Sequence, residues 1–142
     1  RRLSSAASDV YKRQDIDEKR FPEGSTSNFS KVIALDPALI ASHAPSNAYH
    51  VIITHSHPLD EAICFALLSK DKFRFCGLIG SKTKNARFRS RLSKMGIKAE
   101  QLKKLTCPIG IDEINSKEPV KVAISIAAQL SIWQETNRIR IV

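Results

Sequence analysis

Short apolar runs alternate along the chain with segments in which apolar residues recur at helical spacing. Residues 31–35 have the length and composition of a short strand, residues 49–54 those of a buried strand, and residues 73–79 those of a strand that is covered on both faces. Residues 58–68, 82–95 and 120–134 repeat apolar side chains every three or four positions, which predicts helices. We also expect a brief helix over 37–40 and a helical piece over 99–105. The pattern predicts an α/β protein with parallel strands, and its last helix, apolar around most of its circumference, should be deeply buried.

The two ends of the chain depart from this pattern. Residues 1–14 (RRLSSAASDVYKRQ) have no apolar period and resemble a translated sequencing adapter, so we predict a foreign or disordered segment, an artefact of sequence assembly. Residues 15–18 read as the tail of a strand, with Asp17 near its end, before a loop rich in Pro, Gly and Ser. The first strand of the sheet is therefore expected to be missing. The predicted domain covers 15–136, and 137–142 is a tail that fits a short edge strand or a frayed end equally well.

A strand, a turn and a basic helix follow one another over residues 73–91. Such a junction gathers free backbone N–H groups and the positive end of the helix dipole at the carboxyl edge of a sheet, where anions bind. The sequence lacks the first glycine of the usual phosphate-binding loop, so a plain connection with solvated lysines remains an equal alternative. The candidate anion site consists of the turn, its N-cap and the first helical turn: Gly80, Ser81, Lys82, Thr83 and Lys84.

The net charge and the cysteines of the sequence indicate which kind of ligand the protein binds and in which cellular compartment it is expected. The net charge of +9 falls by 3 to +6 when the four basic residues and one acid of residues 1–14 are left out, and much of the excess lies in 82–91. This concentration favours a local anionic ligand over nucleic acid, because aromatic residues do not alternate with the charges. The three cysteines form no C-x-x-C pair, so neither a disulfide framework nor a zinc site is indicated. With no apolar run long enough to span a membrane, we expect a cytoplasmic protein.

Four stretches of the sequence resemble a known family. They are VIITHSHPLDEAICFALLS (51–69), FCGLIGSKTKNARFRSRL (75–92), LTCPIG (105–110) and KEPVKVAISIAAQL (117–130). These stretches are similar to the C-terminal Rossmann-like domain of the xanthine dehydrogenase accessory factors of the XdhC/CoxI type. The resemblance covers residues 15–133 and implies a doubly wound parallel sheet, here without its first strand and glycine-rich turn.

The resemblance implies a maturation factor that binds molybdenum cofactor, protects it, assists its sulfuration and delivers it to xanthine dehydrogenase. Catalysis would then belong to the partners, the molybdenum subunit of xanthine dehydrogenase and a cysteine desulfurase, and a homodimer is an open alternative. Family members also look like NAD(P) binders, so an NAD(P)-dependent Rossmann-type oxidoreductase is the second hypothesis. Only Asp17 matches the family's acid after the second strand, and the chain is expected to be a fragment.

Three further residues carry candidate chemistry. His55 and His57 could share a metal or a phosphate, but their spacing of two residues on an extended segment does not favour joint binding of a metal. A metal site would also need a third ligand. The nearest candidate is Asp60, which is expected to cap the following helix instead. His57, before a proline, fits better as a turn former or a hydrogen-bond donor to a ligand. Cys107 follows Thr106 in a turn, where an exposed thiol of lowered pKa could hold sulfur or a molybdenum centre. A packed loop cysteine is the favoured alternative.

Overall fold

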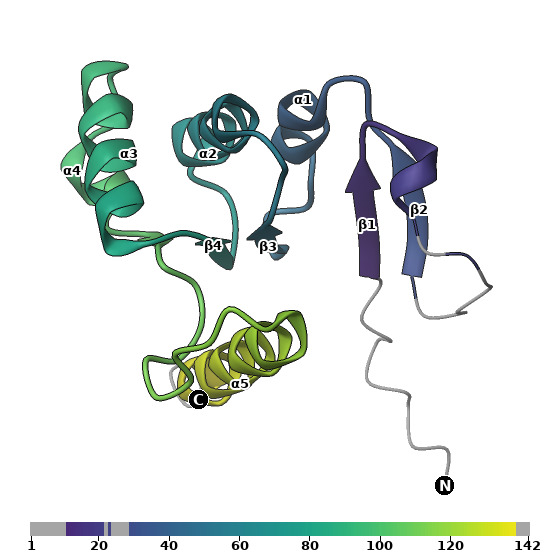
Figure 1. Ribbon diagram of the computed structural model, residues 1–142. Coiled ribbons are helices and arrows are strands. Elements are labelled where there is room, and N and C mark those ends of the chain that lie inside the picture. The colour runs from purple at the N-terminus through teal and green to yellow at the C-terminus, as the bar shows by residue number, and fades with distance from the viewer. Residues whose placement is uncertain (1–10, 22, 24–28, 139–142) are drawn as a thin grey trace, which may run out of the picture.

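The computed structural model describes residues 11–21, 23 and 29–138, and it shows parallel strands alternating with helices (Figure 1). The strands are β1 (Tyr11–Asp15), β2 (Phe29–Ile33), β3 (Tyr49–Ile52), β4 (Phe75–Leu78) and β5 (Leu105–Thr106). The helices are η1 (Glu18–Arg20), α1 (Pro37–Ser42), α2 (His57–Lys70), α3 (Lys82–Lys94), α4 (Ala99–Leu102) and α5 (Pro119–Arg138). The predicted Rossmann-like α/β fold is confirmed.

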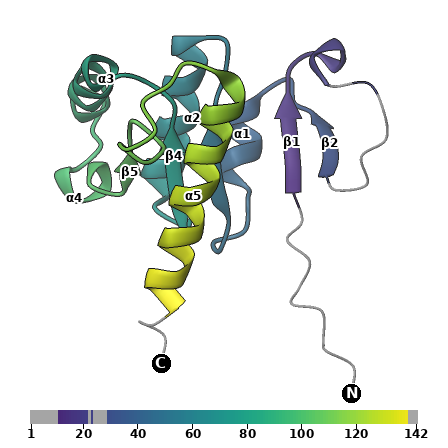
Figure 2. The ribbon, with the colours of Figure 1, turned by 60° about the horizontal axis from the view of Figure 1, so that its bottom comes forward.

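The described strands form two sheets in which all pairs are parallel. β1 pairs with β2, and β3, β4 and β5 pair in that order. Figure 2 shows the β1–β2 pair standing beside the larger sheet rather than within it. The predicted boundary at residue 15 falls at the end of β1, since the strand begins at Tyr11, inside the segment that we expected to be foreign.

β4 is the centre of the larger sheet, and all four of its residues are buried. Leu78, Cys76 and Leu105 pack with the apolar faces of α2 and α3 on one side of the sheet. On the other side, Phe75 packs with residues of the loop after β5 and of α5. In Figure 1, α1 and α2 lie above the strands and α5 lies below them. A four-residue apolar run thus became a strand that is covered on both faces, as its sequence predicted.

The last helix is longer and much less buried than its sequence suggested. It continues to Arg138, so residues 137 and 138 are helical, while 139–142 lie outside the described residues. Only Ser125 and Ile126 are buried, and the side chains of Val120, Ile124 and Ile132 are each more than half exposed. The expectation of deep burial is wrong because one apolar face of α5 packs on the sheet and the described residues do not cover the other face.

Candidate functional site

The carboxyl ends of β3, β4 and β5 meet at one edge of the larger sheet. Ile79 N–H donates to the carbonyl of Ile52 at 3.1 Å, and Ile109 N–H donates to the carbonyl of Leu78 at 3.0 Å. These two bonds bring the segments after the three strands side by side. The structure therefore places the loop with His55, the turn with Gly80 and the turn with Cys107 at one edge, as expected for parallel strands.

The amino end of α3 has the geometry that was predicted for it. The backbone of Ser81 is extended, and its hydroxyl accepts a hydrogen bond from Lys84 N–H at 3.1 Å, so Ser81 is the N-cap. Lys82 and Thr83 follow as exposed residues. Within the described part of the chain the Lys82 ammonium makes no ion pair, so it presents a free positive charge beside the positive end of the helix dipole.

Lys84 does not present a free ammonium group. Its Nζ pairs with Asp60 Oδ2 at 2.8 Å, donates to the carbonyl of Ile79 at 2.9 Å and lies 5.2 Å from the centre of the Phe88 ring. The Lys84 side chain is only 14% exposed. The expectation that both lysines face an anionic ligand is therefore wrong for Lys84, because the Asp60 carboxylate already neutralises its charge.

The absence of a side chain at Gly80 leaves space for the side chain of Lys84. A Cβ atom at position 80 would lie 2.7 Å from Lys84 Cδ, closer than real Cβ contacts. The missing side chain thus makes room for the aliphatic stem of Lys84 as it crosses the turn toward Asp60.

Asp60 is the most important residue that the sequence reasoning misjudged. It is 1% exposed and accepts hydrogen bonds from Thr54 N–H at 3.2 Å and from Thr54 Oγ1 at 2.7 Å, besides the ion pair with Lys84. The cap of α2 is Ser56, whose hydroxyl accepts from Leu59 N–H, so the capping role predicted for Asp60 is wrong. Helices α2 and α3 follow neighbouring parallel strands, so their first turns lie side by side. The acidic Asp60 in one first turn and the basic Lys84 in the other could therefore have predicted this ion pair from the sequence.

The two histidines of the β3–α2 connection are both exposed. His57 is the first residue of α2, one position earlier than predicted, and its ring lies 6.4 Å from the ring of Phe88 in an edge-to-face arrangement. Within residues 11–21, 23 and 29–138, no three His, Cys, Asp or Glu side chains gather as metal ligands would. His55 and His57 thus remain candidates for contacting a ligand at the sheet edge.

Cys107 is a packed residue and not an exposed thiol. It is 8% exposed and belongs to the same buried cluster as Cys64 and Cys76. Burial raises the pKa of the Cys107 thiol, although the positive charges of Lys84 and Arg89 oppose this effect. The packed loop cysteine, which was the favoured alternative, is confirmed. The other alternative, an exposed thiol of lowered pKa, is wrong because desolvation of the thiolate outweighs the nearby charges.

Asp17 lies after β1, on the smaller sheet. Its carboxylate accepts a hydrogen bond from Lys19 N–H at 3.0 Å and caps η1. Two positions earlier, the Asp15 carboxylate accepts hydrogen bonds from Ile16 N–H and from Asp17 N–H. Both carboxylates therefore have local partners at the end of β1.

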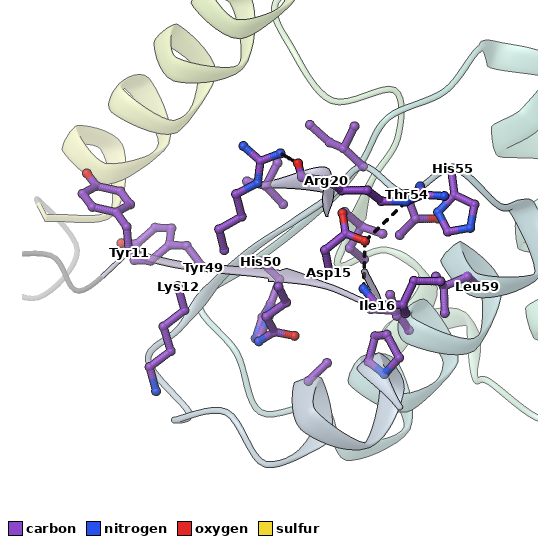
Figure 3. A pocket seen from close by; sticks show the side chains of 18 residues that line it. Tyr11, Lys12, Asp15, Ile16, Arg20, Tyr49, His50, Thr54, His55 and Leu59 are labelled. Atoms are coloured by element: carbon purple, nitrogen blue, oxygen red, sulfur yellow. Dashed lines mark hydrogen bonds and ion pairs between the residues drawn. The ribbon is translucent and has the colours of Figure 1, made fainter. Parts of the chain in front are cut away.

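A cavity of about 1090 Å³ separates β1 from β3. It is lined by β1 and by Ile16 after it, and by β3 with Thr54 and His55 beyond its end. Figure 3 labels residues from both strands around this space, among them Tyr11, Asp15, Tyr49 and His50. Side chains of α1 and α2 line the floor, among them Ala41 and Leu59. The ring of His50 lines this space, and its Nε2 is buried without a hydrogen-bond partner among the described residues.

Together, the parallel strands, the helices on both faces of the larger sheet and the polar loops at its carboxyl edge define an α/β protein of the Rossmann-like class. The family model described as the XdhC Rossmann domain matches residues 4–130. The chain therefore belongs to the XdhC Rossmann domain family, and at the level of that family its role is that of an XdhC-type accessory protein.

A search of curated proteins gave no match to the chain. None of the helices in the described part of the chain has both the length and the apolar character needed to cross a membrane.

Proposed function

We propose that this chain is a cytoplasmic accessory protein that binds molybdenum cofactor, protects it and passes it to the molybdenum subunit of xanthine dehydrogenase. The match of the XdhC Rossmann domain model to residues 4–130 is the observation that carries this proposal. A cysteine desulfurase, which would supply sulfur to the cofactor, is the second partner that we propose. In this role the cofactor is cargo, so the chain needs to hold and release it and does not need to catalyse a reaction.

The amino end of α3 is where we place the anionic part of the cargo. The cofactor carries a phosphate or diphosphate on its pterin, and a helix N-terminus with unused N–H groups attracts such an anion. Lys82 adds a charge without an ion pair to any described residue, whereas Lys84 serves Asp60. The exposed rings of His55 and His57 lie on the neighbouring connection and could donate further hydrogen bonds. The buried Cys107 thiol has no part in this binding.

Binding of molybdenum cofactor to the full chain under anaerobic conditions tests this proposal. A charge-assisted hydrogen bond is worth roughly 1.5–3 kcal/mol, and the exposure of Lys82 favours the lower end, so Lys82→Ala should weaken binding by about tenfold. Lys94→Ala is the matched control, because Lys94 is also an exposed lysine of α3. It lies twelve residues farther along the helix, about 18 Å by the helical rise, which exceeds the Debye length at physiological salt.

Two results would contradict the proposal. If neither the cofactor nor a pterin phosphate binds, the accessory role of this chain fails. If Lys82→Ala and Lys94→Ala weaken binding equally and with the same dependence on salt, the attraction is diffuse and the α3 terminus is not the site. A positive result is then extended by mixing the loaded chain with the cofactor-free molybdenum subunit and measuring the activity that appears in that subunit.

A further inference from the structure

The helix α3 and the turn after it carry a large excess of positive charge. Residues 82–98 contain seven basic side chains and no acidic one. Lys84 and Arg91 are paired with Asp60 and Glu61 of α2. The other five basic side chains make no ion pair within the described part of the chain. This short stretch therefore accounts for most of the net charge of +9 of the whole sequence.

Three of these side chains form a row along the outside of α3. Arg87, Arg91 and Lys94 are exposed and are spaced at i, i+4 and i+7, so they lie on one side of the helix. By the helical rise they follow one another at about 6 Å and about 4.5 Å along the axis. Another side of the helix, with Phe88 and Leu92, is buried in the core. The three exposed residues are called the basic row from here on.

Arg91 is the member of the basic row that has an ion pair. Its Nη1 lies 3.3 Å from Glu61 Oε2, and 63% of its side chain is exposed. An exposed pair of this kind contributes little to stability, and the guanidinium keeps further N–H groups for another carboxylate. All three members of the row are thus available to an external anionic group.

The basic row is unfavourable for α3 itself. Like charges three or four positions apart on a helix repel each other, and both Arg87 with Arg91 and Arg91 with Lys94 are such pairs. The helix contains no acid that could relieve this repulsion. Arg91 and Lys94 complement the helix dipole in the last turn, but Arg87 lies too far from that end to gain from it. Carboxylates of a partner would remove the repulsion, and local conflicts of this kind are typical of functional surfaces.

The basic row is far from the part of the sheet in which a strand is expected to be missing. In both Figure 1 and Figure 2, α3 lies at one side of the molecule, and β1 and β2 lie at the other side. A strand added beside β1 would therefore not cover the row. The exposure of these three cations thus does not depend on the expected missing strand.

The residues around the basic row favour a protein as the partner. A helix that binds a membrane surface inserts apolar side chains, but Phe88 and Leu92 are already buried. Single-stranded nucleic acid stacks on aromatic side chains, and none of the exposed residues of α3 is aromatic. Strong binding to a duplex uses on the order of six to ten phosphate contacts, more than three cations supply. The exposed residues beside the row are small, so the surface of a protein can approach closely: Thr83, Ala86, Ser90 and Ser93.

We propose that the basic row of α3 docks an acidic surface of a partner protein, which presents carboxylates at intervals of about 4.5–6 Å. Glutamates at i, i+4 and i+7 of a helix have this spacing. Charge complementarity of this kind accelerates association and fixes the orientation of the partner. The interaction goes beyond cofactor binding at the amino end of α3 and does not depend on it.

The test uses the full chain labelled with nitrogen-15 and two helical peptides, with binding followed by NMR. The first peptide, acetyl-AEQAAEQAEAQAEQAEA-amide, has its glutamates along one side of the helix. The second, acetyl-AEQAAQEAAEQEAQEAA-amide, has the same composition with the glutamates distributed around the helix. We expect the first peptide to bind more tightly by about threefold or more, because more of its carboxylates meet a cation. Its chemical-shift changes should centre on residues 87–94 and not on 80–84.

Two charge-reversed variants give an independent check. Arg87→Glu combined with Lys94→Glu should weaken binding of the first peptide by about tenfold or more, because like charges then face each other. Lys117→Glu combined with Lys121→Glu is the control. It changes the net charge equally at exposed positions near the start of α5, which packs on the other face of the sheet. This control should leave binding nearly unchanged, and neither variant should alter binding of molybdenum cofactor.

Several outcomes would overturn the proposal. They are absence of binding, equal binding of the two peptides, shift changes centred on residues 80–84, and equal weakening by both double variants with the same salt dependence. Tighter binding of a DNA duplex or of phosphatidylglycerol vesicles at residues 87–94 would identify a different class of partner and would also overturn it. Circular dichroism verifies that each variant is folded, and the two peptides test the unmodified chain whatever the variants do.

Discussion

Replacing Lys84 by methionine separates a structural lysine from a ligand-binding one. The substitution keeps the aliphatic stem, which lies over Gly80, and removes the ammonium group that pairs with Asp60. The Asp60 carboxylate would then be buried at 1% exposure with only its two hydrogen bonds from Thr54. The hydrogen bond from Lys84 Nζ to the Ile79 carbonyl and the contact with the Phe88 ring are lost as well. We therefore expect Lys84→Met to destabilise the folded chain while the packing of the aliphatic stem remains in place.

The size of the effect follows from the burial of both partners. Removing one partner of a buried ion pair costs about 3–5 kcal/mol, and the two remaining bonds from Thr54 favour the lower end, about 3 kcal/mol. For a chain of this size each kcal/mol lowers the melting temperature by roughly 3–4 °C, so Tm should fall by roughly 10 °C. Lys82→Met is the control, because Lys82 is exposed on the same helix turn and should change stability by about 0.5 kcal/mol or less.

Urea unfolding followed by the fluorescence of Trp133 and by circular dichroism measures both variants. Combining Lys84→Met with Asp60→Asn should recover part of the loss, because the unpaired charge is then absent. Equal and small effects of Lys84→Met and Lys82→Met on stability would refute the reasoning. A normal stability of Lys84→Met together with a large loss of cofactor affinity would restore Lys84 to the anion site.

Three other predictions concern thiols, acid and nucleotides. Under native conditions a maleimide should label Cys107 before Cys64 and Cys76, because only Cys107 has any exposed surface among the three. Labelling should be slow and should become faster as pH rises, since burial raises the pKa of all three thiols. Equally fast labelling of Cys76, seen by mass spectrometry, would contradict this. Burial lowers the pKa of His50 below its ordinary 6.5, so its contribution to stability is present above that pH and is lost as pH falls through the folded pKa. His50→Leu should therefore reduce the loss of stability between neutral pH and about pH 5 in urea unfolding, and an unchanged loss would count against the assignment. NAD(P) should bind weakly or not at all, because the glycine-rich turn expected after the first strand is missing from the sequence and the Asp17 carboxylate already caps η1; micromolar affinity by calorimetry would disprove this.

The local elements of this protein could be predicted from its sequence. The apolar run that became β4, the N-cap Ser81 and the start of α1 at Asp36-Pro37 all depend on residues within about four positions of one another. The alternation of such elements predicted the α/β class and placed the candidate residues at the ends of parallel strands. Side-chain periodicity and capping are local interactions, so a single sequence contains the information that they need.

Only the tertiary structure decided which charges and surfaces remain available. Lys84 meets Asp60 across 24 positions of sequence, and this contact changes a candidate ligand into a structural cation. Cys107 is buried because β5 and the turn after it pack beside β4, and α5 remains half exposed because one apolar face has no cover among the described residues. Burial and charge pairing depend on which distant segments become neighbours. Hydrophobic periodicity is a local property of the sequence, so it cannot predict these contacts.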